Sequence, residues 1–248
     1  KPKNGTGKRT VIFQSVNTGS DWMLKWDKNK DTGDSLYCIT LIGFGEIFAG
    51  GDYYIEQGPI GMFNFMYYNE TEETWVYSNI NSNSSVVTSL AIDKDTADAM
   101  YAGLQGEGIW KSSSDGDDGW NWMQVLNTTA IIRTIAIHYS GTQRTILAAG
   151  DATMMWKSTN NGGNWSSINV PSYLSKIIFH PSYQSPDYLW AMSASGNNIY
   201  STTNGGANWS NVNTTSVPKI MSDLQIDQSD NAKIYVGTPM GVHQTNPS

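Results

Sequence analysis

Four ionisable side chains end equivalent apolar segments of the sequence and are its first candidates for chemistry. They are Asp93, His138, His180 and Asp227. Two carboxyl groups held about 5 to 10 Å apart can serve as acid and nucleophile, or as acid and base, in glycoside hydrolysis. Asp93 and Asp227 are therefore the candidate catalytic pair. A structural role is the favoured alternative, because an aspartate that ends a strand commonly caps the turn that follows.

A second group of oxygen ligands could hold calcium. Asp27, Asn29 and Asp31 are spaced like the start of an EF-hand calcium loop. The pattern then departs from that loop, since Thr32 stands where glycine is expected and Cys38 where the final glutamate is expected. A solvated turn is the commoner explanation. No other cofactor is expected, because the three histidines are dispersed and match no zinc site.

The charge of the chain excludes several classes of partner. The net charge is −7, the isoelectric point is about 4.8, and the only arginines are Arg9, Arg133 and Arg144. Nucleic-acid binding needs a basic surface that displaces counterions from phosphates, and none is visible. No apolar run approaches the roughly 20 residues that span a bilayer. A carbohydrate or a protein is therefore the expected ligand, with neither nucleic acid nor membrane insertion.

The segments that carry the candidate residues belong to a repeat. The apolar runs ending at Asp93, His138, His180 and Asp227 follow one another at intervals of 45, 42 and 47 residues. A second run follows each, of the type Tyr-Ala-Gly, as at Met100–Gly103. Each unit holds four short apolar runs separated by turn residues, which is typical of a propeller blade. The sequence predicts an all-β propeller of four-stranded antiparallel blades, with the first strand of each blade innermost and buried on both faces.

The length of the chain accommodates five blades, with six, seven or a partial ring as alternatives. Residues 1–10 are predicted to form an N-terminal tail, and residues 11–248 a single propeller domain. The last three strands need a fourth to complete the fifth blade, and we expect Met23–Trp26 to supply it. The strand at Val11–Gln14 is then surplus. Its unpaired edge could support self-association, because open strand edges pair readily.

A loop motif recurs between the third and fourth runs of the repeat. It reads Ser/Thr-x-Asn-x-Gly-x-x-Trp, and its clearest copies lie 44 residues apart, from Trp165 to Trp209. The short polar side chains can bond nearby amides, glycine permits a positive φ, and Trp covers the loop. The motif residues are Ser15, Asn17, Gly19 and Trp22; Ser113 and Asp115; Ser158, Asn160, Gly162 and Trp165; and Thr202, Asn204, Gly206 and Trp209.

This motif resembles the Asp-box, or bacterial neuraminidase repeat (BNR), of β-propellers. Sialidases, xyloglucanase-type glycoside hydrolases and sortilin-type receptor domains are similar in this respect. The resemblance implies that the boxes are structural and lie away from any active face. This chain carries Asn where the box has Asp, at positions 17, 160 and 204. A sialidase-like site would need clustered arginines, which the sequence does not place together, and no xyloglucanase catalytic motif is matched.

Two further features concern the cellular compartment. The single cysteine, Cys38, excludes an intrachain disulfide and fits a buried small hydrophobe. Glycosylation sequons occur at Asn4, Asn69, Asn83, Asn127, Asn164, Asn208 and Asn213. We therefore expect a secreted, extracellular or cell-surface glycoprotein. Its expected role is that of a non-catalytic structural, adhesive or ligand-binding module, alone or in a larger assembly. The alternative is a glycoside hydrolase of the Asp-box propeller type.

Overall fold

The computed structural model consists of strands and the turns that join them. It describes residues 9–14, 23–29, 35–42, 46–55, 61–69, 74–81, 85–93, 99–114, 120–140, 142–181, 185–212, 220–227 and 233–245. Within these ranges no residue is helical. The all-β class predicted from the repeat is therefore confirmed, and no helix that could cross a lipid bilayer is present in the described part of the chain.

Five blades follow one another along the chain, and each is a meander of consecutive antiparallel strands. Blade 1 contains β3 (Ser35–Ile42), β4 (Glu46–Ile55), β5 (Gly61–Asn69) and β6 (Thr74–Ser78). Blade 2 contains β7 (Val87–Ile92), β8 (Met100–Leu104), β9 (Gly108–Ser114) and β10 (Trp120–Leu126). Blade 3 contains β11 (Ile132–Ser140), β12 (Gln143–Gly150), β13 (Met154–Ser158) and β14 (Ser166–Asn169). Blade 4 contains β15 (Leu174–Phe179), β16 (Leu189–Ser193), β17 (Ile199–Thr202) and β18 (Ser210–Val212). Blade 5 contains β19 (Asp223–Ile226), β20 (Ile234–Thr238) and β21 (Gly241–Thr245).

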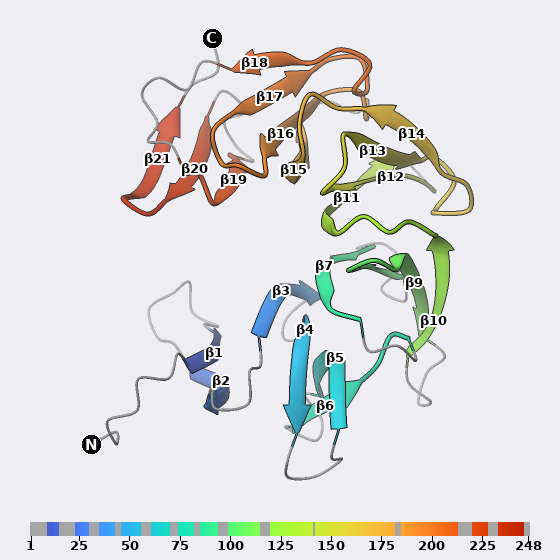
Figure 1. Ribbon diagram of the computed structural model, residues 1–248, viewed down its shortest axis with the longest axis vertical. Helices are drawn as coiled ribbons and strands as arrows, with labels where there is room; N and C mark the ends of the chain where they lie inside the picture. The colour runs from blue at the N-terminus through green and yellow to red at the C-terminus, as the bar shows by residue number, and fades with distance from the viewer. Residues whose placement is uncertain are drawn as a thin grey trace.

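The blades are fanned in an arc with their first strands on the inside. Figure 1 shows β3, β7, β11, β15 and β19 toward the centre, with β6, β10, β14 and β18 outside. This is the arrangement of a β-propeller, and the predicted number of five blades is confirmed.

The hydrophobic core is divided among the interfaces between consecutive blades. Among the described residues, four separate clusters of buried side chains occur, one at each of the four interfaces from blade 1 to blade 5. At the interface of blades 2 and 3, for example, Tyr101 and Ile109 pack against Ile132, Ile146 and Trp156. A four-stranded sheet cannot bury its apolar faces alone, so each blade is stabilised by its neighbours.

Burial peaks on the second strand of a blade, which corrects the prediction that the first strand is buried on both faces. Every residue of β8 is buried, and in β12 only Gln143 is exposed. The first strands are less buried: β19 alternates exposed and buried residues, and in β7 and β15 half or more of the residues are only partly buried. The second strand has a neighbouring strand on both edges and a neighbouring blade on both faces, whereas one edge of the first strand borders the centre of the propeller.

Two strands at the N-terminus pair differently from the prediction. β1 (Arg9–Gln14) and β2 (Met23–Asn29) form a separate antiparallel hairpin, and β1 begins inside the segment predicted as a tail. β21 pairs with β20, so the described part of blade 5 has three strands, and β2 does not supply a fourth. Strands that follow one another closely pair at a small loop-closure cost, which favours the local hairpin.

Candidate binding site in the central channel

Each first strand of blades 1 to 4 carries a β-bulge near its start. The pairing register shifts between Leu36 and Cys38 in blade 1, and at the equivalent point in the next three blades. A bulge leaves one residue unpaired and redirects its side chain. The four residues inside these shifts, which we call the bulge residues, are Tyr37, Thr88, Arg133 and Ser175.

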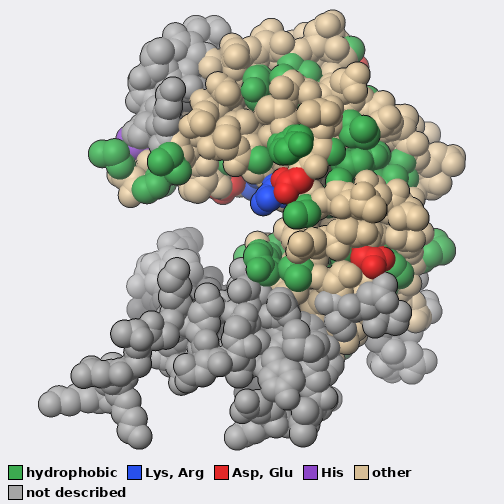
Figure 2. Space-filling model, viewed as in Figure 1, with side chains coloured by type: hydrophobic (Ala, Val, Ile, Leu, Met, Phe, Trp, Pro, Cys, Tyr) green, Lys and Arg blue, Asp and Glu red, His purple; other side chains and the backbone are tan. Residues whose placement is uncertain are grey.

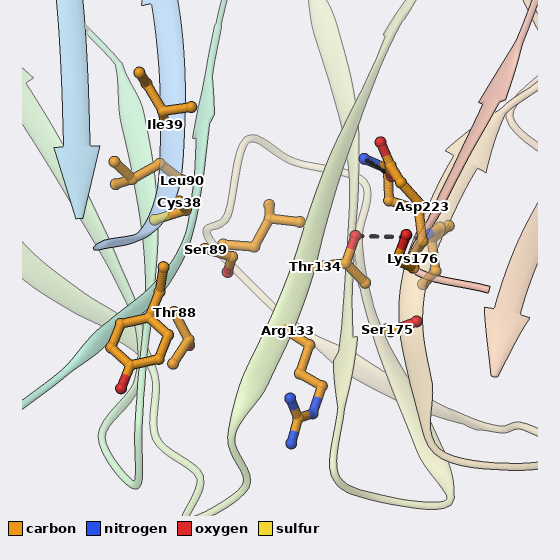
Figure 3. A pocket seen from close by; sticks show the side chains of 14 residues that line it. Cys38, Ile39, Thr88, Ser89, Leu90, Arg133, Thr134, Ser175, Lys176 and Asp223 are labelled. Atoms are coloured by element: carbon orange, nitrogen blue, oxygen red, sulfur yellow. Dashed lines mark hydrogen bonds and ion pairs between the residues drawn. The ribbon is translucent and has the colours of Figure 1, made fainter. Parts of the chain in front are cut away.

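The bulge residues line a cavity at the centre of the propeller, which we call the channel. Its volume is about 480 Å³, and its walls come from β3, β7, β11, β15 and the start of β19. Figure 3 shows these strands around the cavity, with Arg133 and its neighbour Thr134 on β11 pointing in different directions. A smaller cavity of about 350 Å³, which we call the mouth, is lined by the four bulge residues together with Gln105 and Ile131.

Two ion pairs lie along the channel wall. Arg133 makes a bidentate contact with Asp151, in which Nε donates to Oδ1 and Nη2 donates to Oδ2 at 2.8 Å. The hydrogen bond to Asp151 raises the pKa of Arg133 above its ordinary value. Lys176 Nζ lies 2.9 Å from Asp223 Oδ1 and joins blade 4 to blade 5. In Figure 2 a cationic and an acidic side chain are adjacent at the inner edge of the arc.

Hydroxyl groups in the channel bond the backbone of the neighbouring blade. Thr88 Oγ1 donates to the carbonyl of Ile132 at 2.6 Å, and Ser89 Oγ donates to the same carbonyl at 3.1 Å. In the next blade Thr134 Oγ1 accepts from the N–H of Ile177 at 3.2 Å. These contacts satisfy backbone groups at the inner edge of each sheet, which has no strand beyond it.

The candidate catalytic residues lie away from the channel mouth. The bulges lie near the starts of the first strands, whereas Asp93 and Asp227 directly follow the ends of β7 and β19, so the two sets lie on opposite faces of the propeller. Asp93 is 4% exposed and its Oδ2 accepts from Arg144 Nε at 2.8 Å. Asp227 belongs to blade 5, where its Oδ2 accepts from the Tyr235 hydroxyl at 3.3 Å. Neither carboxylate lines the channel.

The two histidines at equivalent positions are held by packing. The buried ring of His138 lies 5.2 Å from the ring of Phe179, between centroids. Burial lowers the pKa of His180, and its backbone N–H donates to the carbonyl of Tyr188 at 3.0 Å. The four strand-end residues Asp93, His138, His180 and Asp227 therefore contact different local partners.

The two clear copies of the loop motif join the third and fourth strands of blades 3 and 4 with the same hydrogen bonds, and we call them the box loops. In blade 3, Ser158 Oγ donates to Asn160 Oδ1 at 3.0 Å, and the N–H of Asn164 donates to the same oxygen at 2.8 Å. The N–H of Gly162 donates to Ser158 Oγ at 3.0 Å, with a φ of 83° that suits glycine. Trp165 closes the loop by donating Nε1–H to the carbonyl of Gly162.

The blade 4 box loop repeats this network with Thr in place of Ser. Thr202 Oγ1 and the N–H of Asn208 both donate to Asn204 Oδ1, at 2.8 and 2.9 Å. The N–H of Gly206 donates to Thr202 Oγ1 at 3.2 Å, and φ of Gly206 is 93°. In both loops the amide oxygen acts only as an acceptor, so Asn can replace the Asp of an Asp-box.

The blade 3 box loop also binds the neighbouring blade. The carbonyl of Asn161 accepts from the Tyr101 hydroxyl at 3.0 Å and from Lys111 Nζ at 3.1 Å, both in blade 2. The side-chain Oδ1 of Asn161 accepts from the N–H of Arg144 at 3.0 Å. The loop therefore stabilises the interface of blades 2 and 3 on the face opposite the mouth.

The remaining predicted site residues are described only in part. Ser15, Asn17, Gly19, Trp22 and Asp115 of the weaker box copies lie outside the described residues, and Ser113 is the penultimate residue of β9. Of the sequon residues, Asn127, Asn164 and Asn208 are exposed and Asn69 ends β5, whereas Asn4, Asn83 and Asn213 lie outside the described ranges.

The calcium candidate is likewise only partly visible. Asp27 and Asn29 lie on strand β2, and Asp31 is outside the described residues. Among the residues that the structure describes, no three His, Cys, Asp or Glu side chains are grouped as metal ligands. Calcium binding stays a prediction.

Sequence analysis named Arg133 only as one of three arginines and missed the site to which it belongs. Tyr37, Thr88 and Ser175 occupy the same position in their blades, yet the four side chains share no chemical type. The only available signal was position in the repeat. When the first strands are aligned, each bulge residue directly precedes one of four equivalent residues, which are Cys38, Ser89, Thr134 and Lys176.

Comparisons with known proteins show the fold alone. No family model matches the chain, and no curated protein matches it. Among solved structures, a chain of the mitotic checkpoint complex is similar over 98% of this chain and 71% of its own, with a TM-score of 0.67 and 10% identity. A GH74 enzyme from Niastella koreensis is similar over 85% of this chain, with a TM-score of 0.61 and 17% identity. An ancestral GH74 enzyme matches 64% of this chain, with a TM-score of 0.49 and 20% identity. The chain spans 35% and 22% of these two enzymes.

Proposed function

We propose that this propeller is a non-catalytic extracellular or cell-surface module that binds a ligand at its channel mouth. The observation that carries the proposal is the contrast between the two faces. On one face the candidate acid Asp93 is buried, paired with the equally buried Arg144, and out of reach of a substrate. On the other face the mouth is open, because Tyr37 is 56% exposed and the Arg133 side chain 44% exposed.

The composition of the mouth favours binding over hydrolysis. A glycoside hydrolase needs two carboxyl groups that face the same substrate. The described lining of the channel includes one carboxylate, Asp223, which is paired with Lys176. Asp151 beside the mouth is engaged by Arg133. The site thus offers hydrogen bonds to a ligand but no matched pair of acids, as in many small binding pockets.

The extracellular assignment rests on the sequons. Asn127, Asn164 and Asn208 are exposed, so a glycan could be attached without disturbing the core. We expect mass spectrometry of the native glycoprotein to show hexose-sized heterogeneity that enzymatic deglycosylation removes. A single mass equal to that of the unmodified chain would contradict this part of the proposal.

The catalytic alternative is a glycoside hydrolase, and the similarity of the fold to a GH74 enzyme is the observation that favours it. The deciding experiment is an assay against a panel of aryl and oligosaccharide glycosides, with Asp93→Asn and Asp227→Asn as controls. We expect no turnover by the native protein. Turnover that both substitutions abolish, in variants whose circular dichroism spectra show the native fold, would replace the binding proposal with hydrolysis.

A further inference from the structure

We infer that the mouth of the channel is a binding site for a neutral saccharide. The inference deepens the proposed function and rests on it. The site consists of the four bulge residues Tyr37, Thr88, Arg133 and Ser175, with Gln105 and Asp151 at its edge. Its volume of about 350 Å³ lies within the range of small-molecule pockets, about 300 to 1,000 Å³.

The hydroxyl groups of the mouth present acceptors to a ligand. Thr88 Oγ1 uses its proton on a backbone carbonyl, since it lies 2.6 Å from the oxygen of Ile132 and 3.1 Å from that of Gly103. Ser175 Oγ is similarly placed at 3.2 Å from the carbonyl of Ser193. A hydroxyl whose proton is engaged retains lone pairs, so both oxygens are oriented to accept from a ligand.

Arg133 presents the complementary donors. Its contact with Asp151 engages Nε and one side of Nη2, which leaves Nη1 and the second Nη2 proton for other acceptors. Asp151 supplies further acceptor capacity beside them. Donors and acceptors therefore alternate around the cavity, which suits vicinal hydroxyl groups because each of them both donates and accepts.

Tyr37 supplies the apolar surface that a sugar ring needs. Its side chain is 56% exposed, although it lines the cavity. An aromatic ring with one polar end matches the C–H face and hydroxyl rim of a pyranose. Ile39, which is 49% exposed, extends apolar surface further along the same strand in the channel.

The charges of the mouth favour a neutral ligand over an acidic or a basic one. Asp151 balances the charge of Arg133, so an anionic group gains little from the guanidinium and meets a carboxylate beside it. The hydroxyls of Thr88 and Ser175, oriented to accept, would also face the oxygens of an anion. A cationic ligand would be opposed by Arg133.

Titration of the purified full chain with oligosaccharides tests the site. The probes are cello-, xylo-, manno- and galacto-oligosaccharides of two to four units, together with glucuronate-containing oligosaccharides, measured by isothermal titration calorimetry. We expect saturable binding of at least one neutral series. Tyr37→Ala and Arg133→Gln should each weaken it by about tenfold or more, whereas Tyr37→Phe should retain it.

A matched control separates the mouth from its surroundings. Tyr173 is 50% exposed and is absent from the lining of the mouth, so Tyr173→Ala should change affinity less than twofold. Equal losses in Tyr37→Ala and Tyr173→Ala would overturn the site, as would unchanged binding in Tyr37→Ala, preference for the acidic series, or no binding of any neutral probe. Glycoside turnover by the native protein would instead overturn the proposed function, so the two failures are distinguishable.

Discussion

Arg144 in blade 3 donates its Nε to Oδ2 of Asp93 in blade 2 across 2.8 Å, and both side chains are about one-twentieth exposed. The guanidinium lies over the ring of Tyr139, 4.8 Å from its centroid, and the Tyr139 hydroxyl donates to the carbonyl of Ile92 at 3.1 Å. An aspartate that sequence analysis selected for acid chemistry thus forms part of an interface between blades.

Removing one partner of this pair should destabilise the propeller strongly. Asp93→Ala leaves a buried guanidinium without its carboxylate, and the expected loss in the free energy of unfolding is about 3–5 kcal/mol. Urea denaturation of the variant and the native protein measures it. Arg133→Ala is the matched control, because the Arg133–Asp151 pair is partly exposed and should contribute no more than about 1 kcal/mol. Equal losses in the two variants would contradict the assignment of Asp93 to the interface.

Gly103, the glycine of the Tyr-Ala-Gly run in blade 2, should be required for stability, because the next blade packs closely against it. A Cβ at Gly103 would lie 2.5 Å from Ser89 Oγ and 2.6 Å from Ile132 Cγ2, below normal contact distances. Gly103→Ala should therefore cost about 1–3 kcal/mol by overpacking, read from the midpoint of thermal or urea unfolding. Gly237→Ala is the control, because its nearest contact would be 3.3 Å from Ser222 Oγ. A smaller loss at Gly103 than at Gly237 would be the contrary result.

The box loops should tolerate Asp but not Ala at their central position. Asn160 Oδ1 accepts two hydrogen bonds, so Asn160→Ala strands two donors and should cost about 1–3 kcal/mol. Asn160→Asp keeps the acceptor and makes its bonds charge-assisted, which should leave the melting temperature equal or higher. Differential scanning calorimetry compares the variants, with Thr159→Ala as a control at an exposed position within the loop. A fall in melting temperature in Asn160→Asp equal to that in Asn160→Ala would refute the acceptor role.

The fold could be predicted because the repeated signals are local. The apolar run that ends at Asp93 and the box-loop motif both specify short strands and turns through interactions between residues close in sequence. The predicted runs fall on strands β7, β13 and β17. The pairing of β2 with β1 was not predicted, because the repeat pattern alone does not determine whether an N-terminal strand pairs with its neighbour in sequence or with the last blade.

The mouth could not be predicted because it depends on bulges and on packing between blades. Tyr37, Thr88, Arg133 and Ser175 share a backbone position but no chemical type, so composition gives no common signal. The burial of Asp93 likewise depends on Arg144, 51 residues away and in another blade. Sequence periodicity predicts which residues form strands, whereas these contacts follow from how the blades are stacked.

Cys38 should make the protein sensitive to alkaline pH. Its Sγ lies 3.8 Å from the carbonyl of Gly50 and 4.0 Å from that of Val87, and burial raises its pKa to about 12. A thiol in the unfolded chain ionises near pH 9, so between about pH 9 and 12 the unfolded state loses a proton that the folded state keeps. Stability should therefore fall as pH rises through this window. Urea unfolding at pH 8 and pH 10.5 should show a smaller decrease in Cys38→Ala than in the native protein, since tyrosines and lysines titrate in both. An identical decrease in the two proteins would show that the thiol is not shielded.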